Sequence, residues 1–309
     1  MKSFLSTIPK YAEDIWPFFT AQILVRVFYF FLLYSSIILF QQWDYSLGLK
    51  SQISFIPPIA WIPLVGFPAA LAIVKISFIT ISLLASLVPQ WRWVRILAFV
   101  AVLEYVSLYY SVLYLDVDWY TFILTAFFLI FLPDNWGKPL EIPKIERQKF
   151  LLVFWGVQAI NLLTYTMSGI GKVLAFINQV IVKEVNILEP QASALITADR
   201  LITTHRNTPL GGFIIDNYFL VWPFFLATIY LLIVSIFIAF KPSLHRLWGL
   251  GLILFHINNY LVIDIGFNAH IFLAALLFLL SPFAPRTFQL KQTLHDLPMF
   301  GTFIKLIIK

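Results

Sequence analysis

The chain has 309 residues, of which 61% are hydrophobic and only 12% carry a charge. Soluble domains carry about 25% charged residues, so this composition excludes an ordinary soluble protein and predicts an integral membrane protein. The net charge of +6 comes from basic residues scattered through short connections, which argues against nucleic acid as a partner, and the absence of cysteine excludes disulfides and thiolate chemistry.

Eight apolar runs follow one another along the chain, and each is a candidate transmembrane helix. A span needs about 20 mostly apolar residues, and the fourth and eighth runs fall short of that length, so we expect them to be tilted, partly buried in the bundle or re-entrant. The predicted spans are 18–41, 65–89, 93–115, 119–133, 149–168, 219–240, 246–263 and 267–283. The sequence therefore predicts an all-α integral membrane protein with about eight transmembrane helices.

The basic residues bear on this arrangement, because cytoplasmic connections of membrane proteins are enriched in Lys and Arg. Alternate connections carry 14 basic residues on one side and 5 on the other, and two more, Arg26 and Lys75, lie within spans. This asymmetry predicts eight crossings with both termini in the cytoplasm. A short basic cytoplasmic tail is expected at 291–309.

The longest connection, 168–218, joins the fifth and sixth spans and is predicted to lie on the non-cytoplasmic side. Within it, segments 173–188 and 191–205 show a helix-like spacing of apolar residues, and Pro190 separates them. We therefore expect an amphipathic cap of re-entrant or interfacial helices over the bundle.

Ionisable residues inside predicted spans are functional candidates, because the bilayer disfavours them unless they are paired or hydrated. Arg26, Lys75 and Glu104 are of this kind. Each also has a structural interpretation. The long stems of Arg26 and Lys75 allow them to reach the interface, and Glu104 can pair with a buried base.

Two polar islands interrupt the apolar runs. In the first, residues 255–282, His256 and Asn259 are three residues apart and share a helix face, and Asp264 follows about one turn later. In the second, the sequence Ser-Gly-Ile-Gly precedes Lys172. A lysine near apolar surface can act as a base, but it can equally anchor a helix end at the interface. A buried histidine is likewise often a satisfied structural group.

The motifs of common soluble enzymes are absent from the sequence. It contains no HExxH, GxSxG or GxGxxG pattern and no phosphate-binding loop ending in GK[ST]. No metal site is predicted.

The two islands resemble motifs of the HTTM membrane domain of the vitamin-K-dependent γ-glutamyl carboxylases. In that family a Phe-His-x-x-Asn motif opens an apolar run that ends in Ser-Pro and a basic residue, and an Ala-Gly-x-x-Lys segment is similar to the island before Lys172. The matching residues of the first island are Phe255, His256, Asn259, Ile265, Gly266, Ser281, Pro282 and Arg286. The resemblance covers roughly residues 15–290 and implies one HTTM-like transmembrane domain at 1–290. It also implies that Lys172 is the base that deprotonates vitamin K hydroquinone, and that Arg26 matches an arginine common in the first span.

The chain departs from the carboxylases at two places. Asp118 stands where the family has a histidine near the start of the fourth span, and the acidic and tryptophan residues that follow the family's lysine are absent here. We therefore do not expect γ-carboxylation itself. Stand-alone HTTM proteins of bacteria have similar lengths, and some resemble helpers in the maturation of exported peptides. This resemblance implies a multi-pass protein of the bacterial inner membrane.

The leading hypothesis is an outward-opening polar pocket that acts on a membrane quinol or on an exported peptide, with a quinone such as vitamin K as the candidate cofactor. Lys172 acts as the base, and His256 with Asn259 stabilises an oxyanion. The residues expected to bind the substrate are Asp118, Asp264, Glu104 and Arg26. The alternative is a non-catalytic membrane partner or immunity-type protein that holds an exported peptide with its cap. A transporter would need broken helices in paired halves, and the sequence shows no such internal symmetry.

Overall fold

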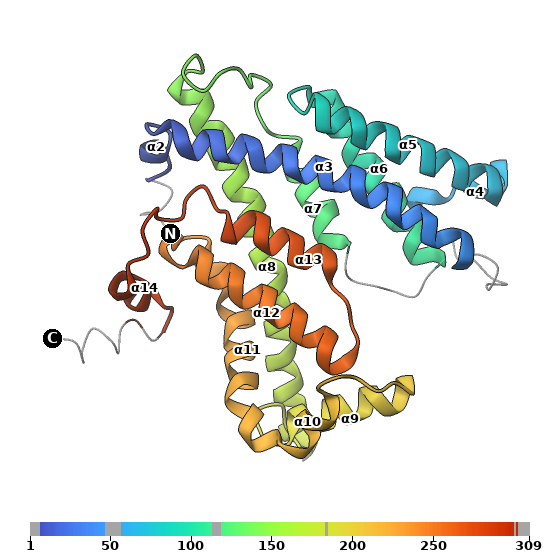
Figure 1. Cartoon of the computed structure of the whole chain (residues 1–309), viewed down its shortest axis with the longest axis vertical. Helices are drawn as coiled ribbons and strands as arrows, with labels where there is room; N and C mark the ends of the chain where they lie inside the picture. The colour runs from blue at the N-terminus through green and yellow to red at the C-terminus, as the bar shows by residue number, and fades with distance from the viewer. Residues whose placement is uncertain (1–6, 47–56, 113–118, 183–184, 300, 302–309) are drawn as a thin grey trace. The chain divides into compact units, whose positions relative to one another are not determined.

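The computed structural model describes residues 7–46, 57–112, 119–182, 185–299 and 301. Within these ranges the regular structure is helical and contains no strand. The chain divides into two compact units, Met1–Val157 and Gln158–Lys309. Figure 1 shows the helices of both units, coloured from blue at the N-terminus to red at the C-terminus.

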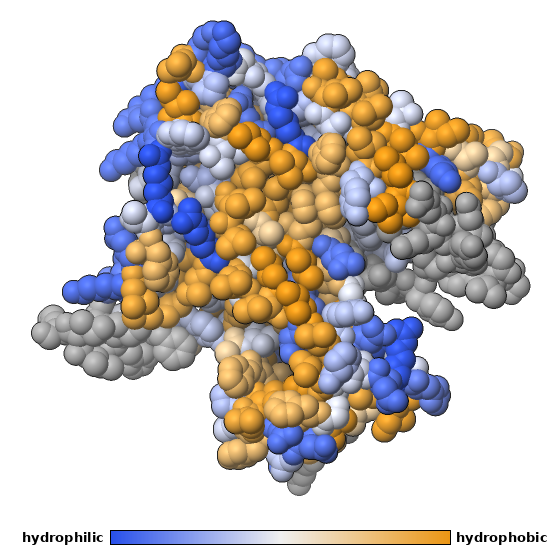
Figure 2. All heavy atoms as spheres, viewed as in Figure 1, coloured by the Kyte–Doolittle hydropathy of each residue, from blue (hydrophilic) through white to orange (hydrophobic). Residues whose placement is uncertain are grey.

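Six helices in the described ranges are long and apolar enough to cross a membrane. These segments are Ile15–Ile38, Phe67–Leu87, Arg92–Ser111, Lys144–Val182, Tyr218–Ile238 and Pro242–Ile263. Large apolar side chains such as Phe30, Ile76 and Phe224 are exposed on these helices, and Figure 2 shows apolar side chains over much of the visible surface. Contiguous exposed apolar surface of this kind suits lipid rather than water. The architecture fits a multi-pass helical membrane protein.

The first unit is built around three long apolar helices. Its elements are α2 (Ile8–Tyr11), α3 (Ile15–Ser46), α4 (Ile62–Val65), α5 (Phe67–Leu87), α6 (Arg92–Val112), α7 (Tyr120–Leu129) and the first part of α8 (Lys144–Val182). Helix α5 packs against α3 and α6, and α7 packs against α6. Stacked aromatic rings fill the interior, with Phe28 on Phe122 at 5.4 Å and Phe78 on Tyr105 at 4.9 Å between centroids.

The spans predicted at 18–41, 65–89 and 93–115 correspond to α3, α5 and α6. The fourth predicted span corresponds to α7, which has 10 residues. A helix of that length measures about 15 Å, half the thickness of the hydrocarbon layer. The expectation of a short fourth helix is therefore confirmed, while the total of eight crossings stays a prediction.

Arg95, one of the 14 basic residues assigned from the sequence to the cytoplasmic connections, is fully buried in the first unit. Its guanidinium group donates to the backbone carbonyls of Pro89, Gln90 and Leu132 and pairs with Asp134 at 2.8 Å. These bonds join the turn before α6 to the segment after α7. Because carbonyls and a carboxylate surround the charge, its burial is compensated.

The start of α8 is tied to the segment before α3. Lys144 forms an ion pair with Glu13 at 2.7 Å, and the Nε atom of Arg147 donates to the Ala12 carbonyl at 2.9 Å. The hydrogen bond from Lys144, together with its charge, lowers the pKa of the exposed Glu13 carboxyl group. These contacts fix two segments that lie far apart in the sequence.

The second unit contains the remainder of α8 and the C-terminal helices. These are α9 (Ala192–Thr204), α10 (Gly211–Asp216), α11 (Tyr218–Ile238), α12 (His245–Ile263), α13 (Asn268–Ala274) and α14 (Leu290–Asp296). The spans predicted at 219–240 and 246–263 correspond to α11 and α12.

Helix α8 continues through the second polar island to Val182, so the helix does not end at 168, where the fifth span is predicted to end. Gly169 and Gly171 both lie within the helix. Gly169 lies where α8 touches the backbone of α11, so a residue without a side chain is needed there. A Cβ atom at this position would lie 2.6 Å from the Ile233 nitrogen. Beside it, the Thr166 hydroxyl accepts a hydrogen bond from the Ile236 N–H at 2.9 Å.

Of the two helices expected in the cap, the second is present as a separate helix and the first is not, and the interfacial position of the cap stays a prediction. Residues 191–205 correspond to α9, whereas residues 173–182 of the expected separate helix 173–188 belong to α8. Helix α9 packs against α10, α11 and α12. Thr208 donates to the Val262 carbonyl at 2.7 Å, which attaches the segment after α9 to the end of α12.

The eighth predicted span, 267–283, contains α13 followed by a π-helical turn at Ala275–Leu279. In this turn the Leu280 N–H donates to the Ala275 carbonyl, five residues back, at 3.0 Å. The turn packs closely on α12, because a Cβ atom at Gly249 would lie 2.7 Å from the Leu279 nitrogen. This segment is therefore shorter and less regular than a full span.

Candidate functional site

A buried group of aromatic and imidazole rings lies within the second unit, centred on His256 of α12. His256 is 3% exposed, and its Nε2 atom lies 2.9 Å from the hydroxyl oxygen of Tyr165. Tyr165 belongs to α8 and is 7% exposed. This buried hydrogen bond between two helices fixes the orientation of the imidazole ring.

Three more rings complete what we call the His256 cluster. His270 of α13 is 4% exposed, and the centroid of its ring lies 5.1 Å from that of His256. The rings of Phe255 and Phe267 lie 4.9 Å and 5.0 Å from the same centroid. Two imidazoles and one phenol are thus enclosed largely by aromatic carbon.

The second ring nitrogen of His256 is the polar atom that the cluster leaves unsatisfied. Nδ1 is buried and has no hydrogen-bond partner within the described residues. Such an atom costs about 1–3 kcal/mol, and folded proteins retain few of them. When Tyr165 donates its O–H to Nε2, a neutral imidazole carries its proton on Nδ1. That N–H can then donate to a substrate oxygen.

Lys172 lies on α8, seven residues beyond Tyr165. Seven residues are two helical turns, so both side chains lie on the same face, about 10 Å apart along the axis. Lys172 is half-buried, and no described residue forms a hydrogen bond or an ion pair with it. Lys172 and His256 are not in direct hydrogen-bond contact, so a shared reaction requires a substrate that reaches both.

Asn259 and Asp264 lie at the end of α12 beyond the His256 cluster. Asn259 is half-buried, and its backbone carbonyl accepts from the Ile265 N–H at 3.5 Å. Asp264 ends the helix with a left-handed backbone (φ 53°), and its carboxylate pairs with Arg206. Asp264 therefore connects α12 to the segment after α9, and its role in substrate binding stays a prediction.

The other predicted substrate-binding residues belong to the first unit. The guanidinium carbon of Arg26 lies 5.9 Å from the centroid of the Trp136 ring, a cation–π geometry. Glu104 lies beside the Trp61 indole. Asp118 lies outside the described residues. Arg26 and Glu104 thus each have a local contact that accounts for them structurally.

A second buried polar group, formed by Gln158, His245 and Ser281, also lies in the second unit. The Nε2 atom of His245 contacts the Ile238 carbonyl at 3.0 Å, and its Nδ1 lies 2.7 Å from the Ser281 hydroxyl. In the neutral ring Nε2 therefore carries the proton and Nδ1 accepts from serine. Gln158 donates to the Ser281 oxygen at 3.0 Å and to the Leu277 carbonyl. His245 and Gln158 are fully buried, so this serine–histidine pair joins helices rather than meeting a substrate.

The chemistry available to the His256 cluster is proton transfer and hydrogen bonding to oxygen. The described part of the chain holds no group of three or more His, Cys, Asp or Glu side chains suited to a metal ion. No protein-family model, curated protein or solved structure matches this chain.

Tyr165, His270 and Phe267 are the members of the cluster to which the sequence analysis assigns no role. His270 lies in the same polar island as His256. Tyr165 is one of 13 tyrosines, and only its spacing of seven residues from Lys172 distinguishes it.

Proposed function

We propose that the second unit is a membrane-embedded acid–base site for a lipid-soluble hydroxyl compound, with a quinol as the substrate class. The observation that carries this proposal is the buried His256 ring, which is held at Nε2 by Tyr165 and has an unsatisfied Nδ1. Phe255 and Phe267 beside it suit a planar apolar ring. A quinone such as vitamin K provides both the ring and the oxygen.

In the proposed reaction Lys172, as the neutral amine, accepts the proton of the substrate hydroxyl group. The O–H bond breaks, its electron pair stays on the oxygen, and the Nδ1–H of His256 donates to the resulting oxyanion. Tyr165 sets the required tautomer by donating to Nε2. Asn259, one turn beyond His256 on the same helix, is the second proposed oxyanion donor.

The proposal also includes the family of the chain and its orientation in the membrane. We place this chain among stand-alone HTTM proteins of the bacterial inner membrane, with eight crossings and both termini in the cytoplasm. The 14-to-5 asymmetry of basic residues supports that orientation. Because Asp118 replaces the histidine of the carboxylases, the proposed activity is quinol-linked or peptide-modifying chemistry on an exported substrate and excludes γ-carboxylation.

The test uses purified protein in lipid nanodiscs, titrated anaerobically with vitamin K hydroquinone while quinolate absorbance is recorded against pH. The wild type should bind the hydroquinone, and the bound hydroquinone should ionise at a lower pH than hydroquinone free in solution. Lys172→Ala should move the ionisation of the bound hydroquinone to higher pH, because the amine that takes up its proton and then pairs with the quinolate is lost. Lys291→Ala is the matched control, since Lys291 is exposed on α14. Unchanged quinolate formation in Lys172→Ala would refute the assignment.

A second candidate function is a non-catalytic partner of an exported peptide, and the surface of the cap favours it. Leu195 and Ile202 on α9 and Phe213 on α10 are exposed apolar side chains. This function predicts that Phe213→Ser impairs retention of such a peptide while Lys172→Ala leaves it unchanged. The reverse order of effects would favour the acid–base site.

A further inference from the structure

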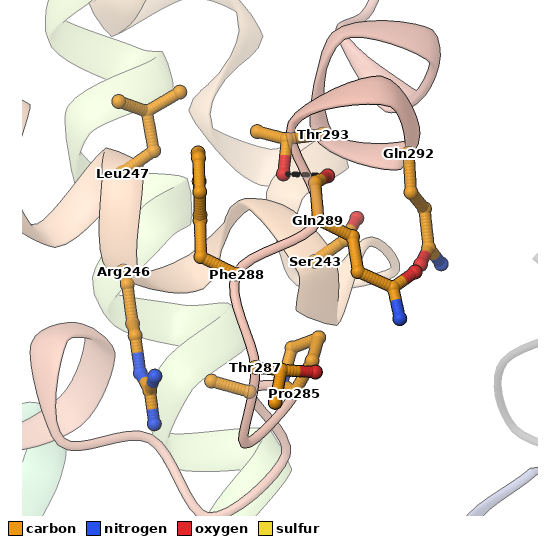
Figure 3. Close-up of a pocket in the computed structure, with 10 residues that line it drawn as sticks. Ser243, Arg246, Leu247, Pro285, Thr287, Phe288, Gln289, Gln292 and Thr293 are labelled. Atoms are coloured by element: carbon orange, nitrogen blue, oxygen red, sulfur yellow. Dashed lines mark hydrogen bonds between the residues drawn. The ribbon is translucent and has the colours of Figure 1, made fainter.

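A surface pocket lies where α12 begins, away from the residues of the His256 cluster. It is a shallow hollow between the first turn of α12 and the segment that leads into α14. Figure 3 shows Arg246 and Leu247 on one side of Phe288, and Gln289 and Gln292 on the other. Gln289 and Gln292 contribute amide groups to the pocket. The pocket is therefore lined by one charged side chain, by neutral side chains that can form hydrogen bonds, and by apolar side chains.

The charge balance of this pocket is positive. Arg246 is exposed, and no described residue pairs with it. The neighbouring Lys241, by contrast, forms an ion pair with one carboxylate oxygen of Asp296 at 3.1 Å. The Ser243 hydroxyl donates a hydrogen bond to the other oxygen of that carboxylate at 2.6 Å. The described residues that line the pocket include no carboxylate. An anionic ligand fits this balance.

The position of the pocket near one end of the apolar segment corresponds to the level of the lipid phosphates in a bilayer. The apolar segment Pro242–Ile263 has 22 residues, which is about 33 Å of helix and close to the thickness of the hydrocarbon layer, about 30 Å. Arg246 lies in the first turns of this segment, where headgroups meet the acyl region. An arginine at such a position favours phosphate, which it binds with two parallel hydrogen bonds.

An apolar stripe leads along α12 from this pocket. Leu247, Leu250, Leu254 and Ile257 are all exposed and are spaced by three, four and three residues, so they form one helix face. Phe288, also exposed, flanks the stripe at the pocket. A lipid whose phosphate contacts Arg246 can lay its acyl chains along this face.

We propose that the pocket is a binding site for an anionic phospholipid. Arg246 contacts the phosphate, Gln289, Gln292 and Thr287 contact the glycerol and headgroup oxygens, and the stripe holds the acyl chains. The site is independent of the proposed acid–base chemistry. A free phosphate ester shares the headgroup chemistry but not the acyl chains, so the test must separate the two.

The experiment measures binding to the full chain in a neutral detergent. The three probes are a short-chain phosphatidylglycerol, a phosphatidylcholine with the same chains, and glycerophosphoglycerol, which is the headgroup alone. We expect phosphatidylglycerol to bind at least tenfold more tightly than either other probe. Arg246→Gln should remove at least about tenfold of that affinity, because one charge-assisted hydrogen-bonded contact is lost.

The matched control is Arg92→Gln, which removes the same charge from an exposed position at the start of α6. It should bind phosphatidylglycerol as the wild type does. Gel filtration and thermal unfolding check that both variants fold. Equal affinity for the two lipids, or an unchanged affinity in Arg246→Gln, would overturn the proposal in favour of non-specific lipid contact. Equal affinity for glycerophosphoglycerol would overturn it in favour of a soluble phosphate ester.

Discussion

Replacing Gly169 with alanine tests directly how α8 packs in the second unit. The added methyl carbon would lie 2.6 Å from the Ile233 nitrogen and 2.8 Å from the Ile233 Cα. Ordinary contact begins at 3.4 Å, so α8 and α11 must separate by about 0.8 Å. Overpacking of this kind costs about 1–3 kcal/mol, whereas alanine gains about 1 kcal/mol over glycine within a helix. We expect a net loss of up to about 2 kcal/mol in the free energy of unfolding.

Gly171→Ala is the matched control, because it makes the same change two residues later on the same helix. A Cβ atom at Gly171 meets nothing within 4 Å, so only the helix-propensity gain of about 1 kcal/mol remains. The propensity terms cancel between the two variants, and their stabilities should differ by about 1–3 kcal/mol. Unfolding in mixed micelles of increasing denaturing-detergent content measures this difference. Equal stabilities would refute the close packing of α8 on α11.

Three further predictions follow from buried or ion-paired groups. Arg95→Gln should destabilise the protein by about 3–5 kcal/mol in the same unfolding assay, because backbone carbonyls in the first unit lose their donors. Tyr165→Phe should cost about 1–3 kcal/mol, because His256 then has both ring nitrogens unsatisfied; an unchanged stability would argue against the 2.9 Å contact. Glu13→Gln should weaken the attachment of α8 to the segment before α3 at pH values above the usual carboxyl pKa. Because Lys144 lowers the pKa of Glu13, the stabilisation is present above the unfolded-state value, about 4.3, and is lost as the pH falls through the lower folded-state value. The stability difference between wild type and Glu13→Gln should vanish in acid.

The long apolar helices are predictable from the sequence, because length and hydropathy alone define a candidate span. Helices α3, α5, α11 and α12 begin and end within a few residues of their predicted bounds, apart from the C-terminal end of α3. The continuation of α8 past Ser168 is not predictable in this way. Glycine weakens a helix in water, and only the tertiary contact at Ile233 shows why Gly169 lies inside one.

The candidate site is predictable only in part, for a related reason. His256 stands out because an imidazole in an apolar run needs a partner. The identity of that partner depends on which residue of α8 faces α12, and nothing local distinguishes Tyr165 from other tyrosines in apolar surroundings. Arg95 illustrates the opposite case. It lies near the end of a span, as an interfacial residue would, but the Leu132 carbonyl and the Asp134 carboxylate that help to enclose it come from a segment about 40 residues later in the chain.

The π-helical turn at Ala275–Leu279 has an evolutionary consequence. Such turns contain one residue more than the α-helix requires, so deleting a single residue would restore regular α-helix. The deletion would rotate His270 by about 100° relative to Ser281, because each residue of an α-helix turns the chain by that angle. His256 and His245 could then not both keep their present neighbours. Insertions and deletions in this turn should therefore be far less tolerated than substitutions that preserve its length.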